Sequence, residues 1–367
     1  MRPGNAVSPA LPVAPQDNHV SVDEEGYAIS KDGLLAFFSD EYGPYIYVHE
    51  RRTGFIVATI APPAAITPMK EAKLNFTSET TPDTGRAGNQ GFEGLTLDRN
   101  TNTLWALLQS STIQDSVGGS KTTNRYSRLF GYNVDNPFKP KLISEYVVPL
   151  PQSSKKNTRA ASELHVVDST TCESAEYFFS SLAYQHEAEL MSFLLAVLVL
   201  ARDGNGFGDT SSDSTFKQAD LISTKGATNI ANTAFDTPSK PVAPNGVLDP
   251  SVTPVQYTSF INLIERPQLA KFGLQVGGAF DSTLVAGKLE SLAVGPLPDK
   301  SGNQLLFVVS DNDFITTKGY QAAEKANGRY VVEPYSDPYA EQYGDASTQI
   351  YIYNVTLPGY SQGSSPY

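Results

Sequence analysis

Glutamate residues recur at matching places along this chain of 367 residues, each at the start of a segment that alternates apolar and polar residues. The four positions are Glu25, Glu93, Glu163 and Glu290. An apolar strand follows each glutamate, and in three of the four copies it ends on acidic residues: Asp40, Asp203, and Asp311 with Asp313. If the starts of these segments meet around one axis, the carboxylates lie close together.

Clustered carboxylates indicate cation chemistry. Hard cations such as Ca²⁺ take several oxygen ligands, and neighbouring carboxylates repel each other unless a cation or a proton lies among them. We therefore predict a calcium site built from all eight positions, with Glu25, Glu93 and Asp203 also as candidate catalytic groups. The alternative is structural, because Asp side chains cap turns and Glu side chains accept backbone N–H donors at strand corners.

Basic and aromatic residues near the same strand ends could bind a substrate anion. Arg202 directly precedes Asp203 and is the first candidate, since guanidinium groups bind phosphate in a bidentate way. For each basic residue, a salt bridge to a nearby carboxylate is the alternative. The other residues assigned to substrate binding are Lys217 and Tyr42, and further phosphate candidates are Arg125, Arg128 and Arg159.

Nucleophilic catalysis has little support in the sequence. There is no Gly-x-Ser-x-Gly motif, and the single cysteine, Cys172, lies in a stretch that matches no repeat. His165 follows Glu163 on the same segment, where it is either a catalytic general base or a packed polar residue. The glycine-rich run 203–209 lacks the ligand spacing of a calcium-binding loop, so we interpret it as a loop over a strand end.

The repeated unit predicts the fold. A carboxylate, a strand, a tight turn and a second strand recur at 23–48, 91–110, 161–205 and 289–313. Such repeats of short strands indicate radial β architecture, in which four-stranded blades surround a channel. We predict an all-β fold: an incomplete β-propeller with four recognisable blades, long loops and one helical insertion. The glutamates would then form a ring in the channel.

Composition and charge restrict the partners. The formal net charge of -12 offers no basic field to a nucleic acid and suits metal cations. No apolar run reaches the roughly 20 residues that a membrane-spanning helix needs. We expect a monomer with a small-molecule ester or phosphoester substrate, and neither a nucleic-acid nor a membrane partner. Sequons at Asn75 and Asn354 would permit glycosylation if the protein is secreted.

The chain divides into one domain with flanking segments. We expect a disordered Pro-rich segment at 1–20, a propeller domain at 21–357 and a disordered tail at 358–367. The interval from Glu163 to Asp203 is the longest between a glutamate and the end of the next strand. It predicts an inserted piece at 171–194, which is either an extra helix or translated non-coding sequence.

Eight motifs of the chain match a known family. They are DEEG (23–26), SDEYGPYIY (39–47), GFEGLTLD (91–98), LWALLQS (104–110), ASEL (161–164), ARDGNGFGD (201–209), LESLAVGP (289–296) and VVSDNDF (308–314). In them the chain resembles the phytase-like, or esterase-like, β-propeller proteins of fungi and bacteria. The resemblance implies a secreted or periplasmic propeller with hydrolase activity related to that of calcium-dependent phytases.

Two departures from the family pattern affect what we expect. No signal peptide is visible, and the blade that usually precedes the DEEG motif is not seen, so we expect a fungal-type member truncated at the N-terminus. Glu290 is followed by Ser291, where the family has glycine.

The predicted function is calcium-dependent hydrolysis of phosphoesters, with water activated in the channel. Two alternatives stay open. One is a carboxylester or lactone hydrolase with a single channel calcium, and the other is a non-catalytic binding propeller that calcium stabilises.

Overall fold

The computed structural model describes residues 20–168, 195–298, 302–325 and 329–357. The expected insertion at 171–194 and the terminal stretches 1–19 and 358–367 lie outside these residues. Within the described parts of the chain, strands dominate, and the two α-helices are short: α2 (Arg266–Ala270) and α3 (Pro338–Tyr343). The all-β prediction is confirmed.

Most strands of the described residues belong to four antiparallel sheets that follow one another along the chain, and two small two-stranded sheets accompany them. The first blade contains β1 (Glu24–Ile29), β2 (Leu35–Asp40), β3 (Ile46–Glu50) and β4 (Ile56–Ile60). The second contains β7 (Phe92–Asp98), β8 (Thr103–Leu108), β9 (Tyr126–Asn133) and β10 (Lys141–Pro149). The third contains β11 (Ala160–Asp168), β12 (Ala196–Arg202), β13 (Lys217–Ser223) and β14 (Gln256–Asn262). The fourth contains β15 (Leu289–Pro296), β16 (Gln304–Ser310) and β19 (Ile350–Val355).

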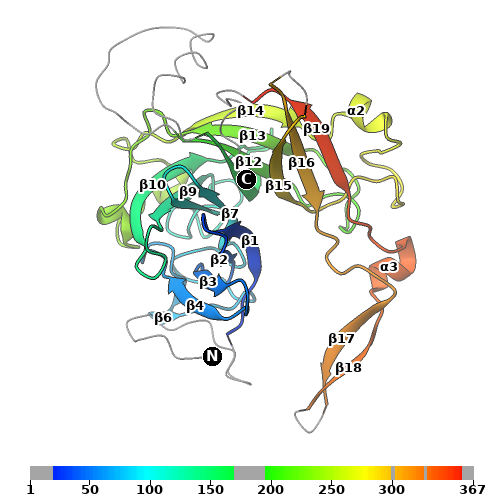
Figure 1. The fold of residues 1–367 in the computed structure, drawn as a ribbon, viewed down its shortest axis with the longest axis horizontal. Helices are drawn as coiled ribbons and strands as arrows, with labels where there is room; N and C mark the ends of the chain where they lie inside the picture. Colours follow the sequence, from blue (N-terminus) through cyan, green and yellow to red (C-terminus); the bar gives the residue numbers. More distant parts are fainter. Residues whose placement is uncertain (1–19, 169–194, 299–301, 326–328, 358–367) are drawn as a thin grey trace.

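The blades are arranged as a β-propeller, as the repeats predicted. Their innermost strands, β1, β7, β11 and β15, contact each other in this order. Figure 1 shows the four blades fanned around a common centre, with an open sector between the first and the fourth. Residues at the start of each innermost strand therefore face the same central space.

Apolar cores fill the spaces between neighbouring blades. Phe37 and Val48 of the first blade pack with Phe92 and Leu104 of the second, and equivalent cores join the second to the third and the third to the fourth. Strand side chains alternate between faces, so one face of each blade can enter each core. Burying a Leu or Phe side chain contributes about 1.5–3 kcal/mol. These cores fix how closely the innermost strands approach.

Two glycines permit the closest approach between blades. A Cβ added to Gly26 would lie 2.4 Å from the backbone nitrogen of Leu95, and one added to Gly94 would collide with the innermost strand of the third blade. The Ser39 hydroxyl bridges the same gap, because it accepts from the Gly26 N–H and donates to the Glu93 carbonyl oxygen. The Glu-Gly pairs of the sequence thus place glutamates of adjacent blades side by side.

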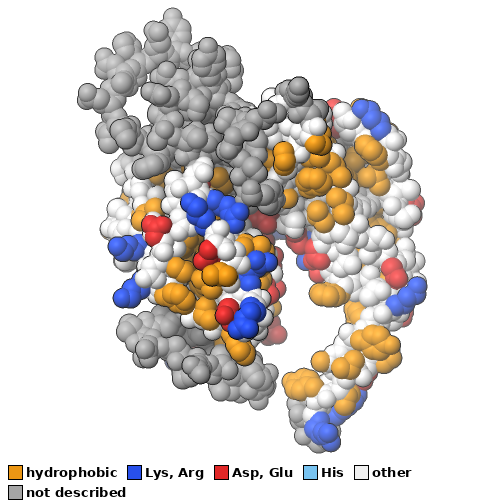
Figure 2. All heavy atoms as spheres, viewed as in Figure 1, with side chains coloured by type: hydrophobic (Ala, Val, Ile, Leu, Met, Phe, Trp, Pro, Cys, Tyr) orange, Lys and Arg blue, Asp and Glu red, His pale blue; other side chains and the backbone are white. Residues whose placement is uncertain are grey.

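A projecting arm follows the second strand of the fourth blade. It consists of the hairpin β17 (Gly319–Glu324) and β18 (Tyr330–Tyr335), and α3 then leads back to β19. Figure 1 shows the arm extending away from the fourth blade. Figure 2 shows a hollow between the arm and the first blade, with acidic side chains along the wall on the side of the first blade.

Two further connections cross between blades. The link from β13 to β14, residues 224–255, contains the 3-10 turns η2 (Ala234–Asp236) and η3 (Pro244–Gly246). In this segment Ile230 and Val242 pack against Val147 of the second blade, although the segment belongs to the third. The link from β4 to β7 contains the short strands β5 (Met69–Lys70) and β6 (Lys73–Leu74).

Candidate functional site

The four repeated glutamates occupy equivalent places in the four blades. Each lies at the start of an innermost strand, where the pairing register with the second strand shifts. A shift of this kind is a β-bulge, which redirects a side chain out of the regular alternation. Glu93 of the second blade interacts electrostatically with Glu25 of the first and Glu290 of the fourth. The bulges therefore aim these carboxylates into one channel.

The tightest group of carboxylates belongs to the first blade. Oxygen atoms of Asp23, Glu25 and Glu41 lie within 4.8 Å of one another, and we call these three residues the acidic triad. The Glu41 side chain is hydrogen-bonded to the carboxyl groups of both Asp23 and Glu93. The Gln109 side-chain amide donates to Glu93 from the end of β8. Four carboxyl groups from two blades thus meet at one place.

Burial and mutual repulsion raise the pKa values of Glu25, Glu41 and Glu93. The pKa of Glu25 is raised to about 7 and that of Glu41 to about 9, first by burial and then by neighbouring carboxylates. Burial, followed by the charge of Glu25, also raises the pKa of Glu93 well above its usual range. Burial raises the pKa of Glu163 to about 8, although Glu163 accepts two backbone N–H donors. Such carboxyl groups hold protons near neutral pH or take up a cation.

Basic side chains lie on more than one side of this group: the buried Arg86, which donates to the Tyr42 carbonyl oxygen, interacts electrostatically with Glu41, and two further cations come from beside the third and fourth blades. Arg202 forms an ion pair with Glu290, and its charge lowers the pKa values of Glu25 and Glu93. Lys288 also lowers the pKa of Glu25. Three cations, Arg86, Arg202 and Lys288, therefore face a larger number of carboxylates. An all-oxygen, carboxylate-rich set of this size fits a hard divalent cation, and Asp23, Glu25 and Glu41 are the residues that could hold it.

Asp40 and Asp203, both predicted as cation ligands, occupy the corresponding turn in two blades. Asp40 is buried and accepts from the N–H groups of Asp23, Tyr42 and Gly43 and from the Tyr47 hydroxyl. Asp203 accepts from Ser214, Thr215 and Phe216 in the same way. These hydrogen bonds hold the turn into the third strand, which is the structural alternative that the sequence left open.

The other predicted catalytic and substrate residues lie in different surroundings. His165 lies on β11 and is partly buried, and burial lowers its pKa to about 4, so its ring is neutral at ordinary pH. Lys217 is fully buried and donates to the carbonyl oxygens of Asp203 and Gly287, away from solvent. Tyr42 lies at the triad, where its hydroxyl is hydrogen-bonded to Asp23.

A pocket of about 640 Å³ adjoins the channel between the third and fourth blades. Arg202 and Lys288 line it, together with Asp311 and Asp313. Lys288 lies 3.1 Å from Asp313 and 3.9 Å from Asp311, so these two predicted ligands pair with a lysine and stand apart from the triad. Further lining residues are Phe207, Asp209, Asp281, Tyr343 and Asp345.

Sequence reasoning missed Asp23 and Glu41, two of the three triad residues. The signal for Asp23 was available, because residues two apart on a strand share a face and Asp23 precedes Glu25 by two. Glu41 carried no such signal. It reaches the triad because its backbone N–H donates to the Asp23 carbonyl oxygen and Gly91 leaves room beside it. Arg86, which is fully buried and donates to the Tyr42 carbonyl oxygen, was also missed.

Comparison with known proteins gives the family. A model named phytase-like, with the description "Esterase-like activity of phytase", matches residues 7–314. The chain belongs to this family. A secreted protein of Arthroderma benhamiae is 33% identical over 323 residues, which cover 82% of this chain and 59% of the relative. The chain thus spans less than two thirds of the length of that relative.

Membership of the phytase-like family supports a hydrolase-like propeller and suggests a small-molecule substrate. The one curated relative named here is a secreted fungal protein. Among the described residues there is no helix with the length and apolar character required to span a bilayer.

Proposed function

We propose that this protein is a calcium-dependent hydrolase of phosphoester substrates that acts in the propeller channel. The observation that supports it is the acidic triad beside Glu93: three carboxyl groups within 4.8 Å of one another and a fourth hydrogen-bonded to Glu41, with raised pKa values for Glu25, Glu41 and Glu93. Folding alone does not require carboxylates that repel each other, and a bound cation would relieve the repulsion.

The triad would hold the cation. When bound there, calcium supplies positive charge that counters the charge of a phosphoester and polarises its phosphoryl oxygen. Tyr42 keeps Asp23 in place through its hydroxyl hydrogen bond. The bulge at Glu25 and the hydrogen bond from the Glu41 N–H keep the other two carboxylates aimed at the same point.

Proton transfer is assigned to Glu93. Its side chain is buried, burial and the neighbouring carboxylates raise its pKa above the usual range, and Gln109 fixes its orientation. Arg202 and Lys288, across the channel, are placed to bind substrate oxygens. Binding there would require Arg202 to share its guanidinium with Glu290.

Metal analysis combined with a panel of esters tests the proposal. The purified protein should contain calcium, should hydrolyse at least one phosphoester, and should lose that activity on chelation and recover it with added calcium. Glu93→Gln should lower kcat by about 10²–10⁴-fold, the usual range for loss of a general acid or base. Glu333→Gln, which removes an exposed carboxylate of the arm, serves as the control and should leave the activity unchanged. Absence of bound calcium together with chelator-resistant hydrolysis would contradict the proposal.

A carboxylester or lactone substrate is the second candidate, and the pocket favours it. Besides Arg202 and Lys288, the pocket carries five aspartates, Asp209, Asp281, Asp311, Asp313 and Asp345, so its charge disfavours a substrate with several phosphate groups. Hydrolysis of neutral carboxylesters or lactones in the same panel, with phosphoesters inert, would select this candidate.

Secretion is proposed for this protein from the relative's description. Asn354 of its second sequon is exposed on β19 and accessible to a glycan. A monomeric state is also proposed, and size-exclusion chromatography with light scattering tests it.

A further inference from the structure

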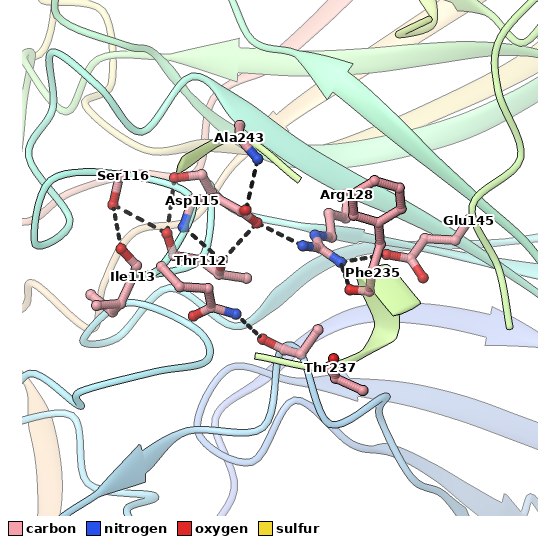
Figure 3. A network of polar contacts seen from close by, with 12 residues as sticks. Thr112, Ile113, Asp115, Ser116, Arg128, Glu145, Phe235, Thr237 and Ala243 are labelled. Carbon is pink, nitrogen blue, oxygen red and sulfur yellow. Dashed lines mark hydrogen bonds and ion pairs between the residues drawn. The ribbon is translucent and has the colours of Figure 1, made fainter. Parts of the chain in front are cut away.

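A group of buried charged side chains ties the 224–255 segment to the second blade. Arg128 of β9 is fully buried and donates to Asp115 at 2.7 Å and to Glu145 of β10 at 2.8 Å. The same guanidinium donates to the carbonyl oxygen of Phe235, in η2, at 2.9 Å. Figure 3 shows Arg128 between the two carboxylates with Phe235 beside it.

Backbone groups complete the attachment. The Ala243 N–H donates to the Asp115 carboxylate at 2.9 Å, and the Ile230 N–H donates to the Glu145 carbonyl oxygen at 2.9 Å. Ala65, in the link between the first and second blades, donates to the Asp236 carbonyl oxygen at 2.8 Å. The 224–255 segment, which belongs to the third blade, is therefore hydrogen-bonded both to the second blade and to the link between the first and second blades. We call the side chains Asp115, Arg128, Glu145 and Asp236 the clasp.

One contact of the clasp requires a proton. The carboxyl groups of Glu145 and Asp236 are hydrogen-bonded to each other, although ionised carboxylates only accept. Among the described residues, the Glu145 Oε2 and Asp236 Oδ1 atoms have no other donor. A single proton between the two carboxyl groups satisfies both oxygens.

We propose that the clasp is a proton-operated fastening: in acid Glu145 carries a proton that it donates to the Asp236 carboxylate, and loss of that proton at higher pH releases the 224–255 segment from the second blade. The charged and titratable groups that face Glu145 are Arg128 and the Tyr132 hydroxyl of β9 and Asp236 of η2. Asp115 acts on Glu145 through Arg128, which it shares.

The direction of the pH effect follows from these neighbours. Burial, followed by the hydrogen bond with Asp236, raises the pKa of Glu145 well above its usual range, and Arg128 offsets only part of the rise. A carboxyl group whose pKa is raised by folding stabilises the fold below its unfolded pKa. That stabilisation is lost as the pH rises through the raised value. The fastening is therefore closed in acid and weakens toward alkaline pH.

Two isosteric variants imitate the shared proton. Glu145→Gln and Asp236→Asn each place an N–H donor between the two side chains at every pH, while Arg128 keeps an acceptor. Hydrogen exchange of the Ile230 and Ala243 amides, corrected for intrinsic base catalysis, should accelerate about tenfold or more between acid and alkaline pH in the wild-type protein. In either variant the acceleration should be about twofold or less. Asp249→Asn, in the same segment but exposed to solvent, should behave like the wild type.

Three results would overturn the proposal. The first is a Glu145→Gln or Asp236→Asn variant in which exchange of the Ile230 and Ala243 amides accelerates with pH as much as in the wild type. The second is slow exchange restored at alkaline pH by added calcium, which would make the shared ion a metal and not a proton. The third is wild-type exchange whose corrected rate stays constant from acid to alkaline pH, over the whole range in which the protein is folded. This last measurement needs no variant, so it decides the matter even if neither variant folds.

Discussion

In the channel, Asp23, Glu25 and Glu41 crowd within 4.8 Å of one another, whereas at the periphery Arg128 lies between Asp115 and Glu145 with hydrogen bonds to both. Both groups are rich in carboxylates; Asp115, Arg128 and Glu145 of the clasp are fully buried, whereas in the triad Glu41 is buried and Asp23 and Glu25 are partly exposed. The clasp contains its own cation, and its carboxylates are paired by residues of the chain. The cations near the triad are engaged elsewhere: Arg202 is paired with Glu290, and Arg86 donates to the carbonyl oxygens of Tyr42, Thr77 and Ala87. The difference indicates that the clasp serves folding and the triad serves a ligand.

Charge alone does not tell the roles of the two groups apart, but the energetics of their pairing does. A buried ion pair is rarely a large net gain in stability, but removing one partner is costly because the other charge stays buried. Carboxylates without a partner are costly from the start, so they persist where a ligand uses them. Each of the following experiments tests this division between the two groups.

Removing the cation of the clasp should have the largest effect. Arg128→Met leaves Asp115 and Glu145 buried without their partner, and should lower the free energy of unfolding by about 3–5 kcal/mol. Chemical denaturation monitored by Trp105 fluorescence measures this loss. Arg51→Met removes an exposed arginine and should have almost no effect. Equal losses of unfolding free energy in Arg128→Met and Arg51→Met would contradict the conclusion that the clasp stabilises the fold.

Neutralising the triad should act in the opposite direction. Because folding raises the pKa of Glu41 from its ordinary value to about 9, the fold keeps it protonated at pH 7 at a cost. Glu41→Gln should therefore stabilise the calcium-free protein by about 3 kcal/mol at pH 7, while weakening calcium binding. Denaturation in chelator, together with calcium titration calorimetry, measures both. Destabilisation of the calcium-free variant would show that Glu41 is structural.

Asp220 of β13 combines features of the clasp and of the triad. It has hydrogen-bond donors, among them the Phe260 N–H, but burial still raises its pKa to about 6. Its raised pKa means that the stabilisation is complete below the unfolded value and is lost as the pH rises to about 6. Relative to Asp220→Asn, the wild type should lose about 3 kcal/mol between pH 4 and pH 7. A pH-independent difference between the two proteins would contradict this.

The smallest effect should come from the contact that brings the first two glutamates together. Gly26→Ala places a Cβ against the backbone of Leu95 and should cost about 1–3 kcal/mol. It should also weaken calcium binding, because Glu25 and Glu93 move apart. Gly295→Ala, on an innermost strand where a Cβ meets only ordinary contact with Phe307, is the matched control. Thermal denaturation and calcium titration of the pair measure both effects.

The fold and the ring were predictable because they depend on repetition. Glutamates at equal places in four alternating segments imply equal places in four blades, and the structure puts Glu25, Glu93 and Glu290 in electrostatic contact. The sequence gives no reason to assign different roles to Asp40 and Glu41. The two are neighbours at the end of β2, but the Asp40 side chain accepts hydrogen bonds from the loop that follows, and the Glu41 side chain reaches the triad.

The clasp was beyond sequence reasoning for a different reason. Arg128 was a phosphate candidate, yet it is fully buried and paired with Glu145 on the adjacent strand. Arg128 also donates to the Phe235 carbonyl oxygen, which lies more than a hundred positions away in a segment without regular pattern. Contacts of this kind depend on how a long loop returns to the surface, and no local spacing encodes them.

The β-bulge that carries each glutamate has a consequence for how such a site can arise. Because the bulge belongs to the blade and not to the channel, copying one blade-coding segment adds a carboxylate already aimed at the axis. Charge then accumulates in the centre by duplication, without a separate substitution for each residue. Later divergence would act on the copies, as the Ser291 that follows Glu290 illustrates.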